Sequence, residues 1–250
     1  MKHLLIYERP VQLNRVAHRN HRLLASAPDY SVASGLNSLP LAVTEFAHAG
    51  RDFPIVFAGN SADAVVPAAL VGLRAGENLL VDGNGAWAGE RYVPAFLRRY
   101  PFVLAEREPG SEDFTVCLDA AYPGLREGGE EGVALFDEDG KDGALLSNAL
   151  QFLQQYQLHL ARTRQFTTAV IRHGLLVERQ ISITAATGEQ FALNGFHVVD
   201  EQKLRELKGK ALQELAQSGD LGWIYAHLVS LGNVERLGRL LDQRLAATAA

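Results

Sequence analysis

Two adjacent arginines among aromatic side chains are the most distinctive candidate for chemistry in this sequence. Residues 77–102 read ENLLVDGNGAWAGERYVPAFLRRYPF. The candidate residues for binding a ligand or a partner are Trp87, Tyr92, Arg98, Arg99 and Tyr100. Arginine suits carboxylates because its guanidinium group can form two parallel hydrogen bonds with one. Aromatic residues and arginine are also typical of interface hot spots. The segment therefore predicts recognition of a small anionic ligand or of a protein partner.

The two arginines are expected to have different roles. Arg98 and Arg99 are neighbours in a helix expected at residues 92–100, so their side chains point about 100° apart. We expect one to pack on aromatic rings and the other to face outward. The alternative to recognition is a structural role, either a cation–π contact worth about 0.5–2 kcal/mol or an ion pair with the acidic middle of the chain.

A weaker candidate combines two histidines with a glutamate. His18 and His21 would share one side of a helix, and with Glu45 they would resemble a metal site built from two histidines and one carboxylate. No HExxH motif accompanies them. The alternative is a set of exposed polar residues without a ligand. The enzyme hypothesis that follows is a metal-dependent oxygenase or peptide-modifying enzyme, and the sequence specifies no cofactor for it.

Other residues give no catalytic constellation. The chain lacks a GxSxG motif, and Gly83-Asn84-Gly85 is interpreted as a turn and not as a phosphate-binding loop. The single cysteine, Cys117, excludes an internal disulfide and is interpreted as a buried, inert thiol. His227 is expected to share a helix face with Trp223 and Ser230, where a histidine is typically a hydrogen-bonded packing residue. Whether the protein is an enzyme is left open.

The negative charge is concentrated in the middle of the chain. The net charge is −5, and residues 101–150 contain 12 acidic and 3 basic residues. Nucleic-acid binding requires a basic surface, so we expect no nucleic-acid partner. The acidic stretch is interpreted as a solvated loop region, and the alternatives are a docking face for a basic partner or a cation site.

The sequence shows no signal peptide and no membrane span. The apolar run near the N-terminus ends at Glu8 and Arg9, and no run reaches 18 apolar residues. We therefore expect a soluble, cytoplasmic protein that does not insert into a membrane. Export to the cell surface without a signal and assembly into homo-oligomers are left open.

Runs of β-branched and aromatic residues predict strands in the first half of the chain. These strands are expected at residues 3–7, 53–59, 65–73 and 78–82. Pro67 favours an edge strand or a bulge, because proline cannot donate a hydrogen bond to a neighbouring strand. Two hairpins are expected at residues 102–119 and 175–199. Their turns are expected at Pro109-Gly110 and at Thr187-Gly188.

Helices are expected mainly in the second half. Pro40 and Gly50 predict the start and the end of an early helix, and Asp200 is a plausible N-cap for a later one. The later helices are expected at residues 143–160, 163–172, 200–216, 219–231 and 234–245.

Together these elements predict an α+β fold with a mostly antiparallel sheet in the N-terminal part and a helical C-terminal part that contains one hairpin. Residues 1–142 are expected to form the strand-rich region. Residues 143–250 are expected to form a mainly helical region packed on it as one compact unit.

Several segments, in order along the chain, point to one family. They include LPLAVTEF at 39–46, PIVFAG at 54–59, GAW with YVPAFLRRYPF up to residue 102, and IYAHLVSLGN at 224–233. On these segments the chain resembles the SapC family of bacterial proteins. The resemblance implies an accessory or binding role linked to a surface layer or to a TonB-dependent outer-membrane uptake system, and it supplies no catalytic residues. A purely structural surface-layer component is the third hypothesis.

Overall fold

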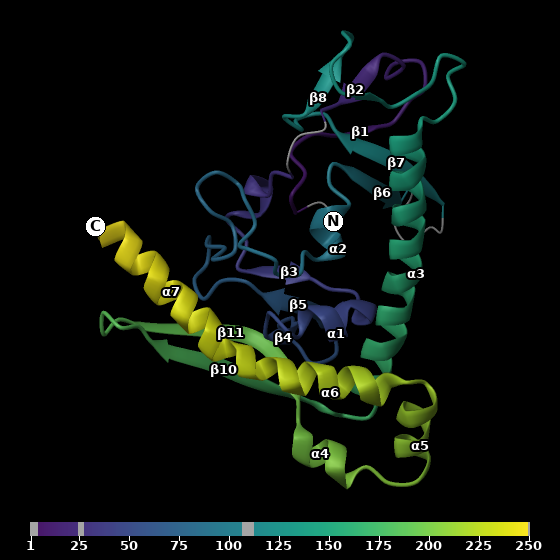
Figure 1. The fold of residues 1–250 in the computed structure, drawn as a ribbon. Coiled ribbons are helices and arrows are strands. Elements are labelled where there is room, and N and C mark those ends of the chain that lie inside the picture. The colour runs from purple at the N-terminus through teal and green to yellow at the C-terminus, as the bar shows by residue number, and fades with distance from the viewer. Residues whose placement is uncertain (1–4, 25–27, 107–112, 250) are drawn as a thin grey trace.

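The computed structural model describes residues 5–24, 28–106 and 113–249, and it confirms the α+β fold. A long helix, α3 (Ala144–Arg172), runs along one side of the molecule from the small sheets at one end to α5 (Lys210–Gln217) at the other (Figure 1). None of the helices in this described part of the chain has both the length and the apolar character needed to cross a membrane.

The largest sheet has five antiparallel strands. Their spatial order is β10 (Leu176–Thr184), β11 (Gln190–Val199), β4 (Ile55–Ala58), β5 (Val66–Leu70) and β3 (Ser38–Pro40). Strand β11 joins β4 through the pairs Phe196↔Ala58 and His197↔Phe57. Strands from the two halves of the sequence thus belong to one sheet.

Two smaller sheets, each of three strands, lie toward the other end of the molecule (Figure 1). One has the order β1 (Pro10–Gln12), β7 (Phe114–Asp119) and β6 (Phe102–Glu106), and the other β8 (Leu125–Glu127), β2 (His21–Leu23) and β9 (Val133–Ala134). The antiparallel pairing of β6 with β7 confirms the first expected hairpin. Its turn at Pro109-Gly110 lies outside the described residues.

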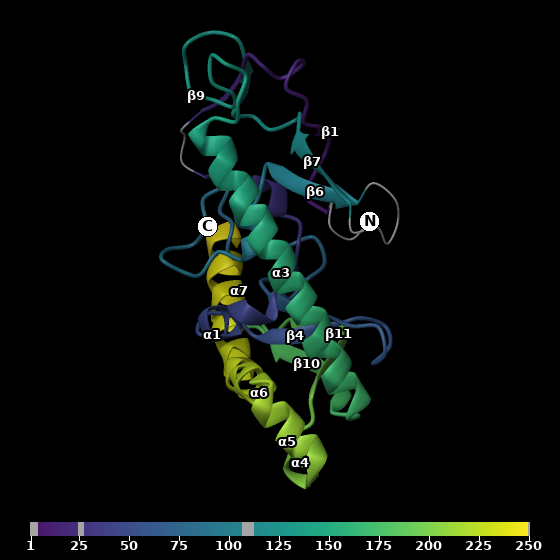
Figure 2. The same ribbon diagram turned by 90° about the vertical axis from the view of Figure 1, so that its right-hand side faces the viewer.

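The main core is aromatic and draws on both halves of the chain. Phe166 of α3 packs edge-on against Phe46 at a centroid distance of 5.8 Å and lies 6.1 Å from Phe57 of β4. All three are buried in the same cluster. The helices α1 (Phe46–Ala49), α6 (Asp220–Ser230) and α7 (Val234–Ala249) also contribute to it. Figure 2 shows α6 and α7 following one another along the length of the molecule.

Side chains of α6 are hydrogen-bonded to the backbone of the five-stranded sheet. The Nε2 atom of fully buried His227 accepts a hydrogen bond from the Val199 N–H at 3.0 Å, so its Nδ1 carries the proton and donates to the Ile55 carbonyl at 2.9 Å. The Ser230 hydroxyl accepts from the Ile55 N–H at 2.9 Å. His227 is thus the hydrogen-bonded packing residue that its helical position predicts.

Three strand predictions need correction. Residues Leu5 and Ile6 lie in a turn, and the first strand is β1. Residues 78–82 form no strand, because the Asn78 side chain bonds the backbone of Ala33 and Leu80 and holds the segment as a loop. Pro67 lies in β5, inside the sheet and not at its edge. It fits there because β3 ends opposite Ala68. No residue of β3 is therefore paired with Pro67, and the N–H that proline lacks is not needed for this pairing.

The helix boundaries also differ from expectation. Pro40 belongs to β3, so the early helix is reduced to a 3₁₀ turn at Val43–Glu45 followed by α1. The helix expected at residues 92–100 is reduced to α2 (Ala95–Arg98), with Pro94 as its N-cap. Residues 143–172 form one continuous helix, α3, in place of two.

The C-terminal predictions are closer to the structure. The hairpin of β10 and β11 turns at Gly188, whose φ of 87° favours glycine. Asp200 is confirmed as an N-cap, since its side chain accepts hydrogen bonds from the N–H groups of Gln202 and Lys203. The expected helix after it is split into α4 (Glu201–Glu206) and α5, because Gly209 between them has a φ of 60°.

Candidate functional site

A buried carboxylate positions the arginine segment. Glu45 is only 4% exposed. Its Oε1 atom accepts hydrogen bonds from the Ala95 N–H at 2.7 Å and from the Tyr92 hydroxyl at 2.9 Å, and its Oε2 atom accepts from the Ala42 N–H at 2.8 Å. Three donors satisfy this buried charge. Glu45 therefore ties the start of α2 and the ring of Tyr92 to the 3₁₀ turn on which it lies.

Tyr92 also holds the side chain of Arg98 in place. The Tyr92 hydroxyl accepts a hydrogen bond from Nη2 of Arg98 at 3.1 Å. Burial raises the pKa of Tyr92 to about 12, with the Glu45 charge acting in the same direction and Arg98 opposing it. The phenol therefore stays protonated and donates a hydrogen bond to Glu45. Arg98 also lies over the rings of Tyr92 and Phe152, at 5.6 and 5.3 Å from their centroids.

The two arginines differ in burial. Arg99 is 3% exposed, and its guanidinium lies over the rings of Phe96, Tyr156 and Tyr7 at 4.8, 5.4 and 5.7 Å. Arg98 is exposed. The structural alternative weighed from the sequence, a cation–π contact inside the protein, describes Arg99 and also the contacts of Arg98 with Tyr92 and Phe152. A recognition role is compatible with Arg98.

A pocket of about 280 Å³ lies beside Arg98. It is lined by Pro28, Asp29, Tyr30, Val32, Leu97, Arg98, Tyr100 and Tyr122. Small-molecule pockets typically start near 300 Å³, so this one suits a ligand of about amino-acid size. Three tyrosines give the pocket aromatic walls and one arginine gives it a cation. We call it the Arg98 pocket.

Ring contacts and a hydrogen bond fix the tyrosine side chains that line the Arg98 pocket. The ring of Tyr100 packs edge-on against Tyr122 at 5.5 Å, and the ring of Tyr30 lies 5.6 Å from Trp87. The Tyr100 hydroxyl donates to the carboxylate of Asp119 at 3.3 Å. Burial and the Asp119 charge both raise the pKa of Tyr100. The tyrosine therefore stays neutral and fixed in orientation.

Asp119 is an internal anchor and not a ligand group. It is fully buried and accepts hydrogen bonds from the N–H groups of Glu8, Arg9 and Ala121 at 2.9, 2.9 and 3.0 Å. Burial would raise the pKa of its carboxyl, but these backbone donors outweigh burial and lower it. Asp119 thus stays ionised and holds Tyr100.

The two charged groups of the pocket keep unused hydrogen-bonding capacity. A guanidinium group has five N–H donors. Within residues 5–24, 28–106 and 113–249, the hydrogen bond of the Arg98 guanidinium is the one to Tyr92. Asp29 accepts from the Ser31 N–H at 2.8 Å through Oδ1, and its Oδ2 atom has no protein donor in the same part of the chain. The arrangement can therefore bind a carboxylate at Arg98 and an amine at Asp29.

Of the residues predicted to bind a ligand, Arg98 and Tyr100 line the pocket. Trp87 and Tyr92 support it by packing against Tyr30 and by bonding Arg98. Arg99 is enclosed elsewhere in the aromatic core. Tyr30 and Tyr122 were not predicted from the sequence, and only their aromatic character hinted at a role.

The structure does not bring the histidines and Glu45 together. His18 and His21 lie near each other, with ring centroids 4.9 Å apart, but His21 belongs to β2 in a small sheet. Glu45 is satisfied by Ala42, Tyr92 and Ala95 in the interior. In the described part of the chain, no three His, Cys, Asp or Glu side chains form a group that could hold a metal ion.

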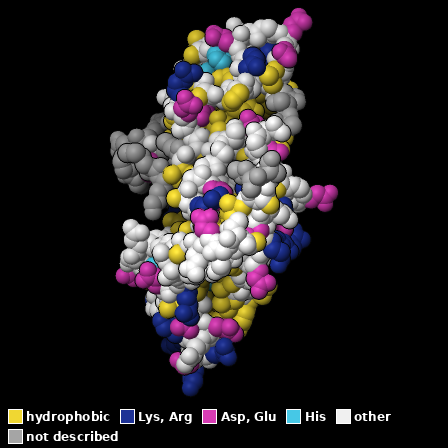
Figure 3. Space-filling model, turned by 90° about the vertical axis from the view of Figure 1, so that its left-hand side faces the viewer, with side chains coloured by type: hydrophobic (Ala, Val, Ile, Leu, Met, Phe, Trp, Pro, Cys, Tyr) yellow, Lys and Arg dark blue, Asp and Glu magenta, His cyan; other side chains and the backbone are white. Residues whose placement is uncertain are grey.

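Neither Cys117 nor the described residues of the acidic stretch belong to a group that could hold a metal ion. Cys117 is half-buried and not fully buried as expected, and burial raises the pKa of its thiol, which agrees with an unactivated cysteine. Basic N-terminal residues contact part of the acidic stretch: Arg15 pairs with Asp142 at 3.1 Å, and Arg19 donates to the Glu138 carbonyl at 2.6 Å. Figure 3 shows acidic and basic side chains mixed over one face of the molecule.

Comparison with known proteins gives one match. The SapC family model matches residues 13–237 of the 250-residue chain. The chain belongs to the SapC family. No curated protein and no solved structure matches this SapC chain. The match includes every residue that lines the Arg98 pocket.

Proposed function

We propose that this SapC protein binds a small ligand that carries a carboxylate and an amine on an aromatic or apolar body, as in a free amino acid. The observation that carries the proposal is the placement of the exposed Arg98 guanidinium. It is fixed by Tyr92 and Phe152, keeps unused N–H donors, and lies beside three tyrosine rings and a carboxylate in one small pocket.

The chemistry of the pocket supports a ligand with both charges. Arg98 and Asp29 line the same cavity, and neither neutralises the other through an ion pair in the described structure. A carboxylate alone would leave Asp29 unmatched, and an amine alone would leave Arg98 unmatched. The tyrosine rings provide apolar surface for the ligand's side chain.

Isothermal titration calorimetry with four related compounds tests the proposal. We expect phenylalanine to bind best, phenylacetate to bind more weakly, and phenethylamine and benzyl alcohol to bind weakest. Arg98→Gln should weaken phenylalanine binding roughly 10- to 100-fold, the loss expected for a hydrogen bond to a charged group. Arg164→Gln, which removes an exposed arginine outside the pocket, is the matched control.

A second arm separates a free amino acid from the end of a protein chain. A peptide that ends in Tyr-Phe with a free carboxylate has the acid but no adjacent amine. If this peptide binds more tightly than phenylalanine, the natural ligand is the C-terminus of a partner protein and not a free amino acid. If none of the compounds gives saturable binding, or if Arg98→Gln binds as the wild type does, the proposal is wrong.

We further propose that ligand binding serves an accessory role in a surface layer or in a TonB-dependent outer-membrane uptake system. Membership in the SapC family supports this context. Cell fractionation with an antibody against the protein tests it. We expect the protein to co-fractionate with surface-layer or outer-membrane proteins, and its confinement to the cytosol would contradict the accessory role.

A further inference from the structure

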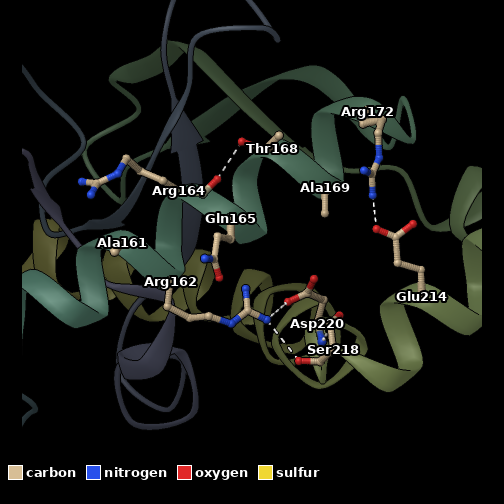
Figure 4. A pocket seen from close by; sticks show the side chains of 10 residues that line it. All are labelled: Ala161, Arg162, Arg164, Gln165, Thr168, Ala169, Arg172, Glu214, Ser218 and Asp220. Atoms are coloured by element: carbon tan, nitrogen blue, oxygen red, sulfur yellow. Dashed lines mark hydrogen bonds and ion pairs between the residues drawn. The ribbon is translucent and has the colours of Figure 1, made fainter. Parts of the chain in front are cut away.

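Helix α3 has an unusual charge distribution. Its 29 residues include three arginines and no aspartate or glutamate. All three arginines, Arg162, Arg164 and Arg172, line one groove of about 730 Å³ between α3 and the segment from α5 to α6 (Figure 4). We call it the α3 groove.

The first arginine forms a fixed part of the groove wall. Arg162 pairs with Asp220, donates to the Ser218 carbonyl at 3.1 Å, and lies 4.5 Å from the centroid of the Trp223 ring. Asp220 is buried. Its charge is therefore matched inside the wall and does not repel an anion in the groove.

The second carboxylate of the groove is matched in the same way. Glu214 of α5 pairs with Arg172 across the groove, and Nε2 of His173 lies 3.5 Å from its other oxygen. Figure 4 shows both arginine–carboxylate pairs on the same side of α3. The two acidic residues that line the groove are thus each paired with an arginine.

Among the described residues, Arg164 is the arginine of the groove that pairs with no acidic residue. In the described residues its guanidinium has no hydrogen-bond or ion-pair partner, and its side chain is exposed. In Figure 4 it extends away from Asp220 and Glu214. Arg172 suits the negative end of the helix dipole in its last turn. Arg164 lies two turns earlier, where that effect has faded, so neither the dipole nor an ion pair accounts for its charge.

We propose that the α3 groove binds an acidic segment of a protein partner. Its lining residues are arginines, their paired acids and small or polar side chains, with no aromatic or large aliphatic residue among those described. An apolar ligand would gain little there. Arg164 and Arg172 are separated by about 12 Å along the helix, a distance that about four residues of extended chain cover. A segment longer than this, with carboxylates spaced along it, can reach both arginine side chains.

Fluorescence anisotropy with a fluorescein-labelled hexaglutamate peptide tests this proposal. We expect saturable binding in 50 mM NaCl that weakens in 300 mM NaCl, because salt screens exposed charges. A hexaglutamine peptide of the same length should not bind. Arg164→Gln should weaken hexaglutamate binding at least about fivefold, and Arg98→Gln, in the other pocket, should not change it.

A gain of affinity separates recognition from a structural role. Glu214→Gln removes the carboxylate that competes for Arg172, so we expect hexaglutamate to bind several-fold more tightly. A merely structural ion pair would give destabilisation without that gain. The proposal is overturned if both Arg164→Gln and Glu214→Gln bind the peptide within twofold of the wild type, or if hexaglutamine binds equally well.

Discussion

The Tyr92 hydroxyl donates a hydrogen bond of 2.9 Å to the buried carboxylate of Glu45. The same oxygen accepts a hydrogen bond from Arg98. An exposed guanidinium is thereby connected to the protein interior through one phenol group. This connection restricts the rotamers of Arg98, and fewer free rotamers reduce the entropy lost when a ligand binds.

Removing the Tyr92 hydroxyl should affect both folding and binding. In Tyr92→Phe, Glu45 loses one of its three donors and Arg98 loses its acceptor. We expect unfolding in urea to require about 1–3 kcal/mol less free energy, and we expect weaker phenylalanine binding by calorimetry. Tyr225→Phe, at a tyrosine of α6 that is 52% exposed, should change neither quantity.

The two arginines should separate stability from recognition. Arg99→Gln should lower the free energy of unfolding by more than about 2 kcal/mol, because it removes a buried side chain that contacts three aromatic rings. Arg98→Gln should lower it by less than about 1 kcal/mol, since the side chain is exposed. Equal losses in thermal or urea unfolding would contradict the distinction.

Acid should destabilise the protein through His227. Burial lowers the pKa of His227 from 6.5 to about 4. Below pH 6.5 the unfolded chain therefore binds a proton that the folded state rejects. The stability contributed by the neutral imidazole is complete above pH 6.5 and falls as the pH drops toward 4. We expect a loss of about 2 kcal/mol from this residue between pH 7.5 and pH 5.

Urea unfolding at a series of pH values measures this effect. His227→Gln should be less stable at pH 7.5, because two buried backbone groups lose their partner. The variant should also lose much of the pH dependence between 6.5 and 4. An identical pH dependence in the variant and the wild type would assign the acid sensitivity to other groups.

Two glycines provide a test of helix packing. A Cβ atom at Gly50 would lie 3.3 Å from both the Ala226 carbonyl oxygen and the Ser230 Cβ atom of α6, and 2.7 Å from the Phe46 carbonyl oxygen. Gly50→Ala should therefore cost about 1–3 kcal/mol through overpacking. A Cβ atom at Gly222 meets nothing within 4 Å. Gly222→Ala should be stabilising by about 0.5–1 kcal/mol, since alanine is the better helix former.

The sequence by itself determined features that depend on neighbouring residues. The turn at Gly188, the N-cap at Asp200 and the different burial of Arg98 and Arg99 follow from backbone geometry over a few positions. Such local preferences persist when the chain folds, because tertiary contacts add to them without reversing them. The family resemblance likewise depends on segments that can be read directly from the chain.

Only the tertiary structure decided what the candidate residues contact. Glu45 was a candidate metal ligand by residue type, and the folded chain encloses it with Ala95 and Tyr92, about 50 positions away in sequence. Tyr30 and Tyr122 line the same pocket as Arg98, although they come from two distant segments of the chain. Long-range packing selects these neighbours through burial and hydrogen bonding, and local sequence patterns carry no record of which distant side chains will meet.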